Sequence, residues 1–328
     1  MARGPGRYHR KGITLTELAD MFPDDAAAEA WFAKQRWPLD KPWCPHCWSM
    51  RVQTGASHPS MPYRCRDCRK RFSVRTGTVM ERSKLGYRIW AFALYLMTTG
   101  IKGTSSMKLS RDLGVTQKTA WHLAHRIREM WSRDHAPFEG PVEADETHVG
   151  GRLQRHSGRH RGIRGRGSVG KTAVAGVLDR PTRRVVATVV PDKKTSTLLP
   201  FVMGHIEPNA QVYTDEWWAY RSLPHHGVVR HGVGQWVDGQ AHTNGLESFW
   251  SLLKRGFHGT FHHVSPKHLD RYVREFSGRF NWRDYDTIEQ MQIMARQMTR
   301  ARLPYEKLIE GGPAYPKLDQ PRLSPPDG

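Results

Sequence analysis

The stretch Val142-Glu143-Ala144-Asp145-Glu146-Thr147-His148-Val149 holds three acidic residues within a run whose two ends are apolar. In an extended strand, successive side chains face opposite sides. Val142 and Ala144 therefore share one face, whereas Glu143, Asp145 and Thr147 share the other. A carboxylate inside a buried strand is costly unless it binds something. The stretch predicts the first strand of an α/β domain that carries an acidic site.

The sequence after this strand continues with alternating strand-like and helical segments. Strand-like runs cover residues 172–178, 184–190 and 210–214, and helical patterning covers residues 246–255, 266–280 and 288–302. The turn Asp179-Arg180-Pro181 separates two of the strand-like runs, as expected for a hairpin. Residues 139–302 are therefore predicted to form a mixed sheet with flanking helices. Residues 303–328 contain several prolines and are expected to form an irregular tail.

The four cysteines of the chain fall in one motif, Cys44-Pro45-His46-Cys47 followed by Cys65-Arg66-Asp67-Cys68. Two Cys-x-x-Cys turns can surround one Zn²⁺ with four sulfurs, so residues 41–80 are predicted to form a zinc ribbon. The alternative is two disulfides. We disfavour it because no secretory signal is present, so a reducing, cytoplasmic compartment is expected. Residues 1–40 are expected to hold one or two short helices broken at Pro23.

Residues 83–135 are predominantly helical in pattern, and residues 105–121 have the order of a helix-turn-helix. Gly114 ends the first predicted helix, Val115 fills the turn and Thr116 caps the second helix. The start of such a second helix contacts base edges, and later positions contact phosphates. The residues predicted to contact DNA here are Gln117, Lys118, Thr119, His122 and Arg126. The alternative is an ordinary two-helix hairpin.

The charge balance also indicates a nucleic-acid partner. Among 328 residues, 51 are Lys or Arg and 31 are Asp or Glu, which gives a formal net charge of +20. Such an excess favours a polyanion, most commonly nucleic acid, over a merely soluble basic protein. No apolar run reaches the length of a membrane span, so no membrane association is expected. The basic segment 150–171 is predicted to be either a solvated loop or an arm that contacts DNA through Arg161, Arg164 and Arg166.

Two further motifs place acidic residues near the first strand. Asp215 follows the strand-like run 210–214, and ligands collect at such strand ends. On a helix, the side chains of Asn244, Glu247, Ser251 and Lys254 share one face. Together, Asp145, Asp215 and Glu247 are predicted to bind two Mg²⁺ ions, with Mn²⁺ as an alternative, for phosphoryl transfer. Glu247 is favoured over the neutral Asn244 as third ligand because it adds negative charge.

These motifs occur together in one order: Cys44 to Cys47, Cys65 to Cys68 with 72–78, Thr119-Ala120-Trp121, Asp145-Glu146-Thr147 with Gly150-Gly151, Thr214-Asp215, His242-Thr243-Asn244, 247–256 and 262–265. In them the chain resembles insertion-sequence transposases of the DDE type, most closely the ISXO-like group with an N-terminal zinc ribbon. The resemblance implies a ribonuclease-H-like catalytic domain in which Asp145 and Asp215 are the first two metal ligands. It also implies Asn or Glu at the third position, followed by a lysine that Lys254 matches.

The predicted function is therefore that of a DNA transposase. It would bind the ends of its element, cleave DNA strands in a metal-dependent reaction and join them to target DNA. A dimer or larger assembly on DNA, associated with the nucleoid, is expected because transposition brings two ends together. The alternatives are a non-catalytic DNA-binding regulator derived from a transposase and a metal-dependent nuclease without a joining step.

Overall fold

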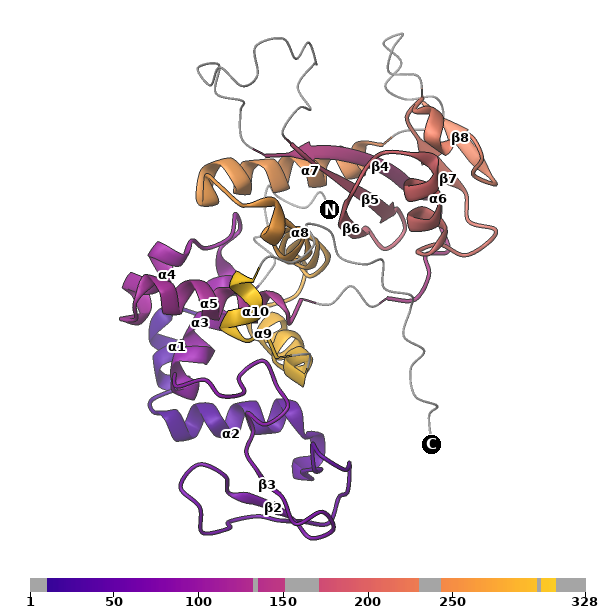
Figure 1. The fold of residues 1–328 in the computed structure, drawn as a ribbon. Helices are drawn as coiled ribbons and strands as arrows, with labels where there is room; N and C mark the ends of the chain where they lie inside the picture. Colours follow the sequence, from indigo (N-terminus) through magenta and orange to yellow (C-terminus); the bar gives the residue numbers. More distant parts are fainter. Residues whose placement is uncertain (1–10, 132–134, 151–170, 230–242, 300–301, 311–328) are drawn as a thin grey trace. The chain divides into compact units, whose positions relative to one another are not determined.

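The computed structural model describes residues 11–131, 135–150, 171–229, 243–299 and 302–310, and these residues form two compact units (Figure 1). The first unit combines the chain up to Ser132 with the returning segment Trp282–Glu310. The second unit contains the intervening residues up to Asn281. Each unit is considered by itself below. No helix in the described ranges is long and apolar enough to cross a membrane.

The first unit begins with two short helices, α1 (Leu15–Met21) and α2 (Asp25–Arg36), on either side of the expected break at Pro23. Thr14 and Glu17 form a capping box at the start of α1, and the Asp24 side chain caps α2. A 3₁₀ turn (Pro38–Asp40) leads into an antiparallel sheet of three short strands, β1 (Val52–Gln53), β2 (Tyr63–Cys65) and β3 (Arg71–Phe72).

The helical part of the first unit contains α3 (Tyr87–Thr99), α4 (Ser106–Leu113) and α5 (Gln117–Arg128), followed after the second unit by α9 (Thr287–Arg296), a 3₁₀ turn (Gln297–Thr299) and α10 (Tyr305–Ile309). Helix α9 packs on α2 and α3. We expected residues 288–302 to belong to the catalytic domain, but the structure groups them with the first unit. The expected irregular tail likewise begins with α10, whose Leu308 is fully buried.

The second unit is built on a five-stranded mixed sheet with the strand order β6-β5-β4-β7-β8. Its strands are β4 (Val142–Val149), β5 (Thr172–Asp179), β6 (Arg184–Val190), β7 (Val212–Thr214) and β8 (His226–Val228). The β4–β5 and β5–β6 pairs are antiparallel, whereas the β4–β7 and β7–β8 pairs are parallel. The predicted mixed sheet with flanking helices is confirmed.

Helices cover both faces of this sheet. Helix α6 (Thr195–Met203) packs on the face formed by Val142 and Ala144, in a core that also holds Phe201 and Tyr220. Helices α7 (Asn244–Gly256) and α8 (Pro266–Asn281) cover the opposite face, where Phe249 and Phe276 are buried (Figure 1). Helix α6 and strand β8 were not predicted. Strand β8 is three residues long, and α6 contains an internal proline, so neither shows a clear hydrophobic period.

Candidate active site and DNA-binding surface

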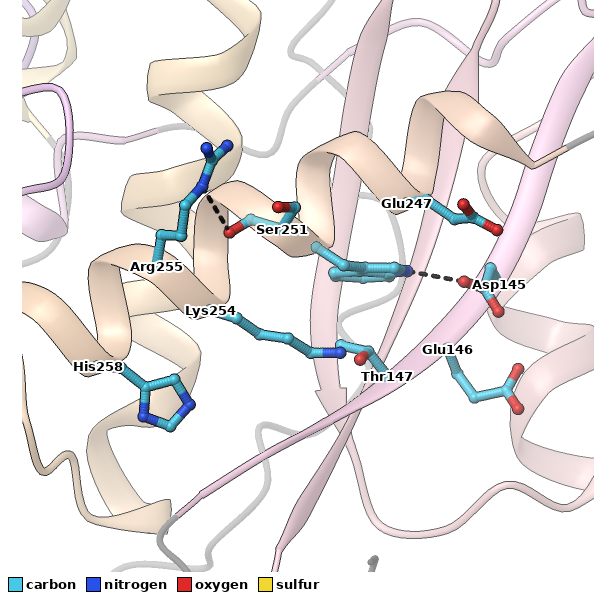
Figure 2. Close-up of a pocket in the computed structure, with 9 residues that line it drawn as sticks. Asp145, Glu146, Thr147, Glu247, Ser251, Lys254, Arg255 and His258 are labelled. Atoms are coloured by element: carbon cyan, nitrogen blue, oxygen red, sulfur yellow. Dashed lines mark hydrogen bonds between the residues drawn. The ribbon is translucent and has the colours of Figure 1, made fainter.

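The alternation of side chains along strand β4 is the predicted one, with Glu143 and Asp145 on the same face of the sheet. Asp145 points toward α7, where its Oδ2 accepts a hydrogen bond of 2.8 Å from the Trp250 indole N–H (Figure 2). Asp145 pairs in register with Gly176 of β5. A Cβ at Gly176 would lie 2.8 Å from the Trp250 ring, so the absence of a side chain there allows the indole to lie against the sheet. Neither Trp250 nor Gly176 was predicted to belong to the site.

Glu143, two residues earlier on the same face, anchors the start of α7. Its carboxylate is 1% exposed and accepts hydrogen bonds of 3.0 Å from the Leu246 backbone N–H and from Arg180 Nε. The Leu246 N–H lies in the first turn of α7, where a negative charge is favourable. A Cβ at Gly245 would approach Glu143 Oε2 to 2.9 Å, which explains the glycine at this contact. Glu143 therefore fixes α7 against β4.

The outer face of α7 carries the predicted site residues. Asn244, Glu247, Ser251 and Lys254 are exposed, whereas Leu246, Phe249, Trp250 and Leu253 are buried. This distribution is the one predicted from the helical spacing. A cavity of about 590 Å³ lies beside this face, and Figure 2 shows the labelled side chains that line it from β4 and α7. Its lining residues are Asp145, Glu146, Thr147, Glu247, Trp250, Ser251, Lys254, Arg255 and His258.

The cavity brings together three of the five residues predicted to act in catalysis, Asp145, Glu247 and Lys254. Asp215 lies just after β7, where its Oδ1 accepts a hydrogen bond of 3.0 Å from the Trp217 backbone N–H. Asp215 and Asn244 are not lining residues of the cavity. The charge of Asp215 nevertheless contributes to raising the pKa of Asp145.

The pKa of Asp145 reflects its burial and the acidic residues near it. Burial, followed by the charge of Glu146, raises the pKa of Asp145 to about 7, and Asp215 acts in the same direction. A divalent cation bound here would offset this repulsion, and carboxylate oxygens are the ligands that Mg²⁺ prefers. The donor set therefore fits a magnesium site. In the described parts of the chain, however, the three predicted carboxylates do not form a cluster with ligand atoms already converged on one point.

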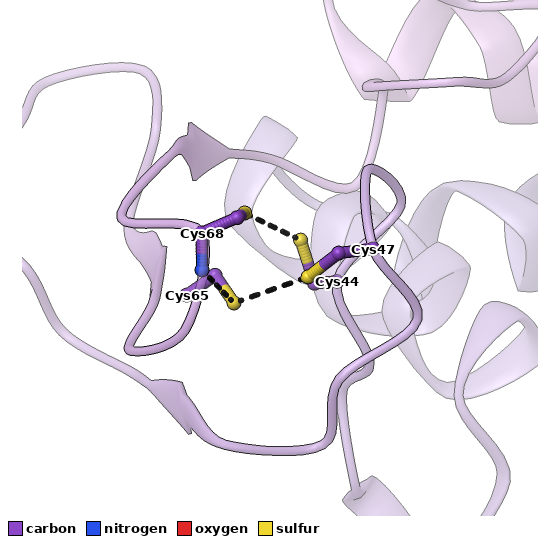
Figure 3. Close-up of side chains that lie close together, drawn as sticks. All are labelled: Cys44, Cys47, Cys65 and Cys68. Atoms are coloured by element: carbon purple, nitrogen blue, oxygen red, sulfur yellow. Dashed lines mark hydrogen bonds between the residues drawn. The ribbon is translucent and has the colours of Figure 1, made fainter.

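The four cysteines do converge. Their Sγ atoms all lie within 4.8 Å of one another, and the Cys44–Cys68 and Cys47–Cys65 pairs are each 3.6 Å apart (Figure 3). Tetrahedral zinc with bonds of 2.3 Å requires sulfurs about 3.8 Å apart, so the four thiols fit structural zinc. They are free cysteines, which excludes the disulfide alternative in this structure.

The two Cys-x-x-Cys turns are built alike. In each, the residue after the second cysteine has a positive φ, 63° at Trp48 and 57° at Arg69. In each, the first cysteine donates its backbone N–H to a carbonyl five residues later, at Ser49 (2.8 Å) and at Lys70 (3.0 Å). Two similar turns that face one another place two pairs of sulfurs around one centre.

The segment predicted to be a helix-turn-helix has the expected local geometry. Gly114 ends α4 in the left-handed conformation, with φ 64°, and the Thr116 hydroxyl caps α5 by accepting the Thr119 N–H. Two hydrogen bonds with Ser110 hold Val115 in the turn. The Val115 N–H donates to the Ser110 carbonyl, and the Ser110 hydroxyl donates to the Val115 carbonyl. Gln117 and Lys118 are exposed at the start of α5 and Thr119 is partly exposed.

The outer face of α5 is in contact with the segment that carries α10. Lys118 Nζ lies 4.6 Å from the centre of the Tyr305 ring, and the same ring packs against Trp121 and His122. His122 Nε2 donates a hydrogen bond of 2.9 Å to the Leu303 carbonyl. Burial lowers the pKa of His122, which favours its neutral form. Lys118 and His122, both predicted to contact DNA, are therefore engaged by this segment.

Arg126 differs from its predicted role as a phosphate contact. Its side chain is buried, donates a hydrogen bond to the Glu81 carbonyl and lies over the Trp90 ring. The helical period places position 126 on the buried face of α5. The prediction rested on the positive charge of Arg126 and did not take this face into account. Arg161, Arg164 and Arg166 lie outside the described residues.

Comparisons with known proteins agree on one family. Residues 137–281 match the ISXO2-like transposase domain, and this range lies within the second unit and ends where that unit gives way to Trp282. An uncharacterized protein in transposable element ISH50 of Halobacterium salinarum is 32% identical over 275 residues, which cover 79% of this chain and 91% of that protein. An uncharacterized transposase-like protein of Haemophilus influenzae is 29% identical over 102 residues, which cover 30% of this chain and 81% of that protein.

Proposed function

Because the chain belongs to the ISXO2-like transposase family, we propose that it is a DDE transposase that binds the ends of its insertion sequence and catalyses strand cleavage and strand transfer. One observation carries this proposal. A half-buried Asp145, oriented by Trp250, shares a cavity with Glu247 and Lys254 in the family-matched domain. The mixed sheet with helices on both faces supports a ribonuclease-H-like domain.

In this proposal, Asp145, Asp215 and Glu247 hold the catalytic divalent ions. Bound Mg²⁺ or Mn²⁺ would activate the attacking water or 3′-hydroxyl and stabilise the leaving oxygen. The chain's own contributions follow from its contacts. The Trp250 N–H fixes the Asp145 carboxylate, Glu143 holds the first turn of α7 and thereby the position of Glu247, and Lys254 offers a cation to the DNA backbone.

End recognition is assigned to the first unit. The exposed start of α5, with Gln117, Lys118 and Thr119, suits base contacts in the major groove. The zinc ribbon adds positive charge, since Arg51, Arg64, Arg66, Arg69 and Lys70 are all exposed on it. His122 would join this surface only after α10 moves. A net charge of +20 supports additional contacts with phosphates, including those of target DNA.

The function is tested by incubating the purified protein with a duplex that contains an element end, in the presence of Mg²⁺. A transposase produces nicks and then joined products, a nuclease produces nicks alone, and a DNA-binding regulator produces neither. Two ends must be brought together, so we also expect a dimer or larger assembly on DNA, measured by light scattering of the complex. No nicking with Mg²⁺ or Mn²⁺, despite specific end binding, would favour the regulator.

The third ligand is tested on the same substrate with two variants of α7. Glu247→Gln should abolish cleavage while end binding is retained, as should Asp145→Asn and Asp215→Asn, because each removes one of the charges that hold the ions. Asn244→Ala should slow cleavage but leave measurable nicking, since Asn244 lies outside the cavity. Normal cleavage by Glu247→Gln together with no cleavage by Asn244→Ala would reverse the assignment.

A further inference from the structure

We propose that Glu146, Lys193 and Tyr220 are positioning residues that hold Asp215 toward Asp145. The inference rests on the proposed function, because it concerns how the metal-binding carboxylates are placed. It assigns a role to Glu146, which directly follows Asp145 in β4. The Glu146 side chain faces the opposite side of the sheet from the contact between Asp145 and Trp250. Figure 2 shows Glu146 pointing away from α7.

Glu146 is a buried carboxylate with two strong partners. Its side chain is 2% exposed, its Oε2 accepts a hydrogen bond of 2.8 Å from the Tyr220 hydroxyl, and its Oε1 lies 2.5 Å from Lys193 Nζ. Hydrogen bonds to a charged group in the interior are among the strongest in proteins. Because leaving such a carboxylate without partners is costly, the three side chains constrain one another.

Both partners of Glu146 are connected to the segment that carries Asp215. The Lys193 ammonium lies 4.4 Å from the centre of the Trp217 ring, and the Lys193 carbonyl accepts a hydrogen bond of 3.2 Å from the Trp217 indole N–H. The Trp217 backbone N–H in turn binds Asp215 Oδ1 at 3.0 Å. Tyr220 ends the 3₁₀ turn (Trp218–Tyr220) that follows directly.

These contacts form a continuous path from the first predicted ligand to the second. It runs from β4 through the Glu146 side chain to Lys193 and Tyr220, then through Trp217 to Asp215. Strand β7 pairs with β4 only at Val142 and Glu143, so the backbone ladder ends before Asp145. Side-chain contacts therefore contribute to fixing Asp215 relative to Asp145, and the Glu146 cluster supplies such contacts.

The test measures Mn²⁺ binding to the zinc-loaded full-length protein by isothermal titration calorimetry, together with the Mn²⁺ dependence of cleavage. The variants are Lys193→Met and Tyr220→Phe, each checked for thermal unfolding. Lys194→Met is the matched control, because Lys194 is 71% exposed and its nearest acid is Asp192 at 3.7 Å. Loss of a group that orients a ligand weakens metal binding by about tenfold or more.

The two variants separate positioning from simple electrostatics. Removing the Lys193 charge beside several carboxylates would by itself tighten cation binding. Positioning predicts the opposite, about tenfold weaker Mn²⁺ binding in Lys193→Met and weaker binding in the charge-neutral Tyr220→Phe, with cleavage recovered at high Mn²⁺. Lys194→Met should bind like the unaltered protein.

Tighter binding in Lys193→Met with unchanged binding in Tyr220→Phe would overturn the positioning role and leave the proposed function intact. If Lys193→Met fails to fold, Tyr220→Phe decides, and binding equal to the unaltered protein refutes the inference. If the unaltered protein itself binds no Mn²⁺ outside its zinc site, the proposed catalytic centre is wrong and the inference is wrong with it.

Discussion

Replacement of Gly176 by alanine should disable the site without removing any functional group. Gly176 lies opposite Asp145 in the β4–β5 pair, and an added Cβ would lie 2.8 Å from Trp250 Cη2 and 2.9 Å from Trp250 Cζ2. It would also lie 3.2 Å from the Leu246 side chain. The indole must therefore move, and with it the N–H that holds Asp145.

The size of the effect follows from these distances. Carbon atoms in contact are separated by about 3.5–4.0 Å, so the indole must shift by roughly 0.7–1.2 Å. Such overpacking costs about 1–3 kcal/mol of stability. A shift of this size along the 2.8 Å bond to Asp145 would lengthen it to roughly 3.5–4.0 Å, longer than a normal hydrogen bond, unless the aspartate follows. A misplacement of about 1 Å near reacting groups costs on the order of 100-fold in rate.

The chain provides a matched control in Gly227 of β8. A Cβ there would lie 2.8 Å from the Tyr213 ring, so Gly227→Ala overpacks the same sheet by a similar amount at a different place. Both alanine variants should lose comparable stability in urea unfolding, but only Gly176→Ala should lose cleavage on the order of 100-fold.

A double variant separates the clash from the lost hydrogen bond. Phenylalanine lacks the indole atoms that the new Cβ would meet, so Gly176→Ala with Trp250→Phe should regain stability relative to Gly176→Ala alone. It should not regain cleavage, because phenylalanine has no N–H for Asp145. Normal cleavage by Gly176→Ala, or full recovery in the double variant, would refute the role assigned to Trp250.

Three further outcomes are expected. The purified protein should contain about one Zn²⁺ per chain and Cys47→Ser should lose it, which elemental analysis of fresh protein checks. End binding should weaken steeply with salt and in Lys118→Ala, whereas Tyr305→Ala should tighten it about two- to fivefold by releasing Lys118, as measured by fluorescence anisotropy. Folding raises the pKa of Asp145 from 3.8 to about 7, so the folded state retains a proton that the unfolded chain releases. Without Mg²⁺ or Mn²⁺, the unfolding free energy should therefore fall as pH rises from about 4 to about 7, and Asp145→Asn should reduce this fall.

Helices and strands were predictable from the sequence where the hydrophobic period or a capping residue was clear. Strands β4 and β6 and helices α7 and α8 have clear periods and were located to within one or two residues. The break between α4 and α5 was equally clear, since Gly114 and Thr116 have strong local preferences. Helix α9 was also located, but its packing partner was not, because hydrophobic periodicity shows that a helix has a buried face without showing what covers it.

The candidate site was predicted in part for a similar reason. Acidic residues at strand ends and on one helix face indicate where charge gathers, so Asp145 and Glu247 could be anticipated as candidate site residues. The supporting contacts could not. Trp250 looks like an ordinary core residue, and its link to Asp145 depends on the β4–β5 register that places Gly176 opposite. The Glu146–Lys193 pair joins residues far apart in sequence, and no local pattern marks it.

The division of the chain also bears on the regulator alternative. The family-matched domain is inserted within the first unit, and Trp131 and Trp282, at the points of departure and return, stack with ring centres 4.7 Å apart. The returning helix contributes Met291 and Met294 to the core of the first unit, and Met298 follows it, all fully buried. Burial of three methionine side chains stabilises a fold by about 5–9 kcal/mol, a large share of typical total stability. An N-terminal half that ended before the second unit would lose these methionines from its core, so the fold of the first unit depends on the segment that follows the family-matched domain. That dependence argues against a regulator that uses the N-terminal half alone, because such a fragment would lack part of the core of its own fold.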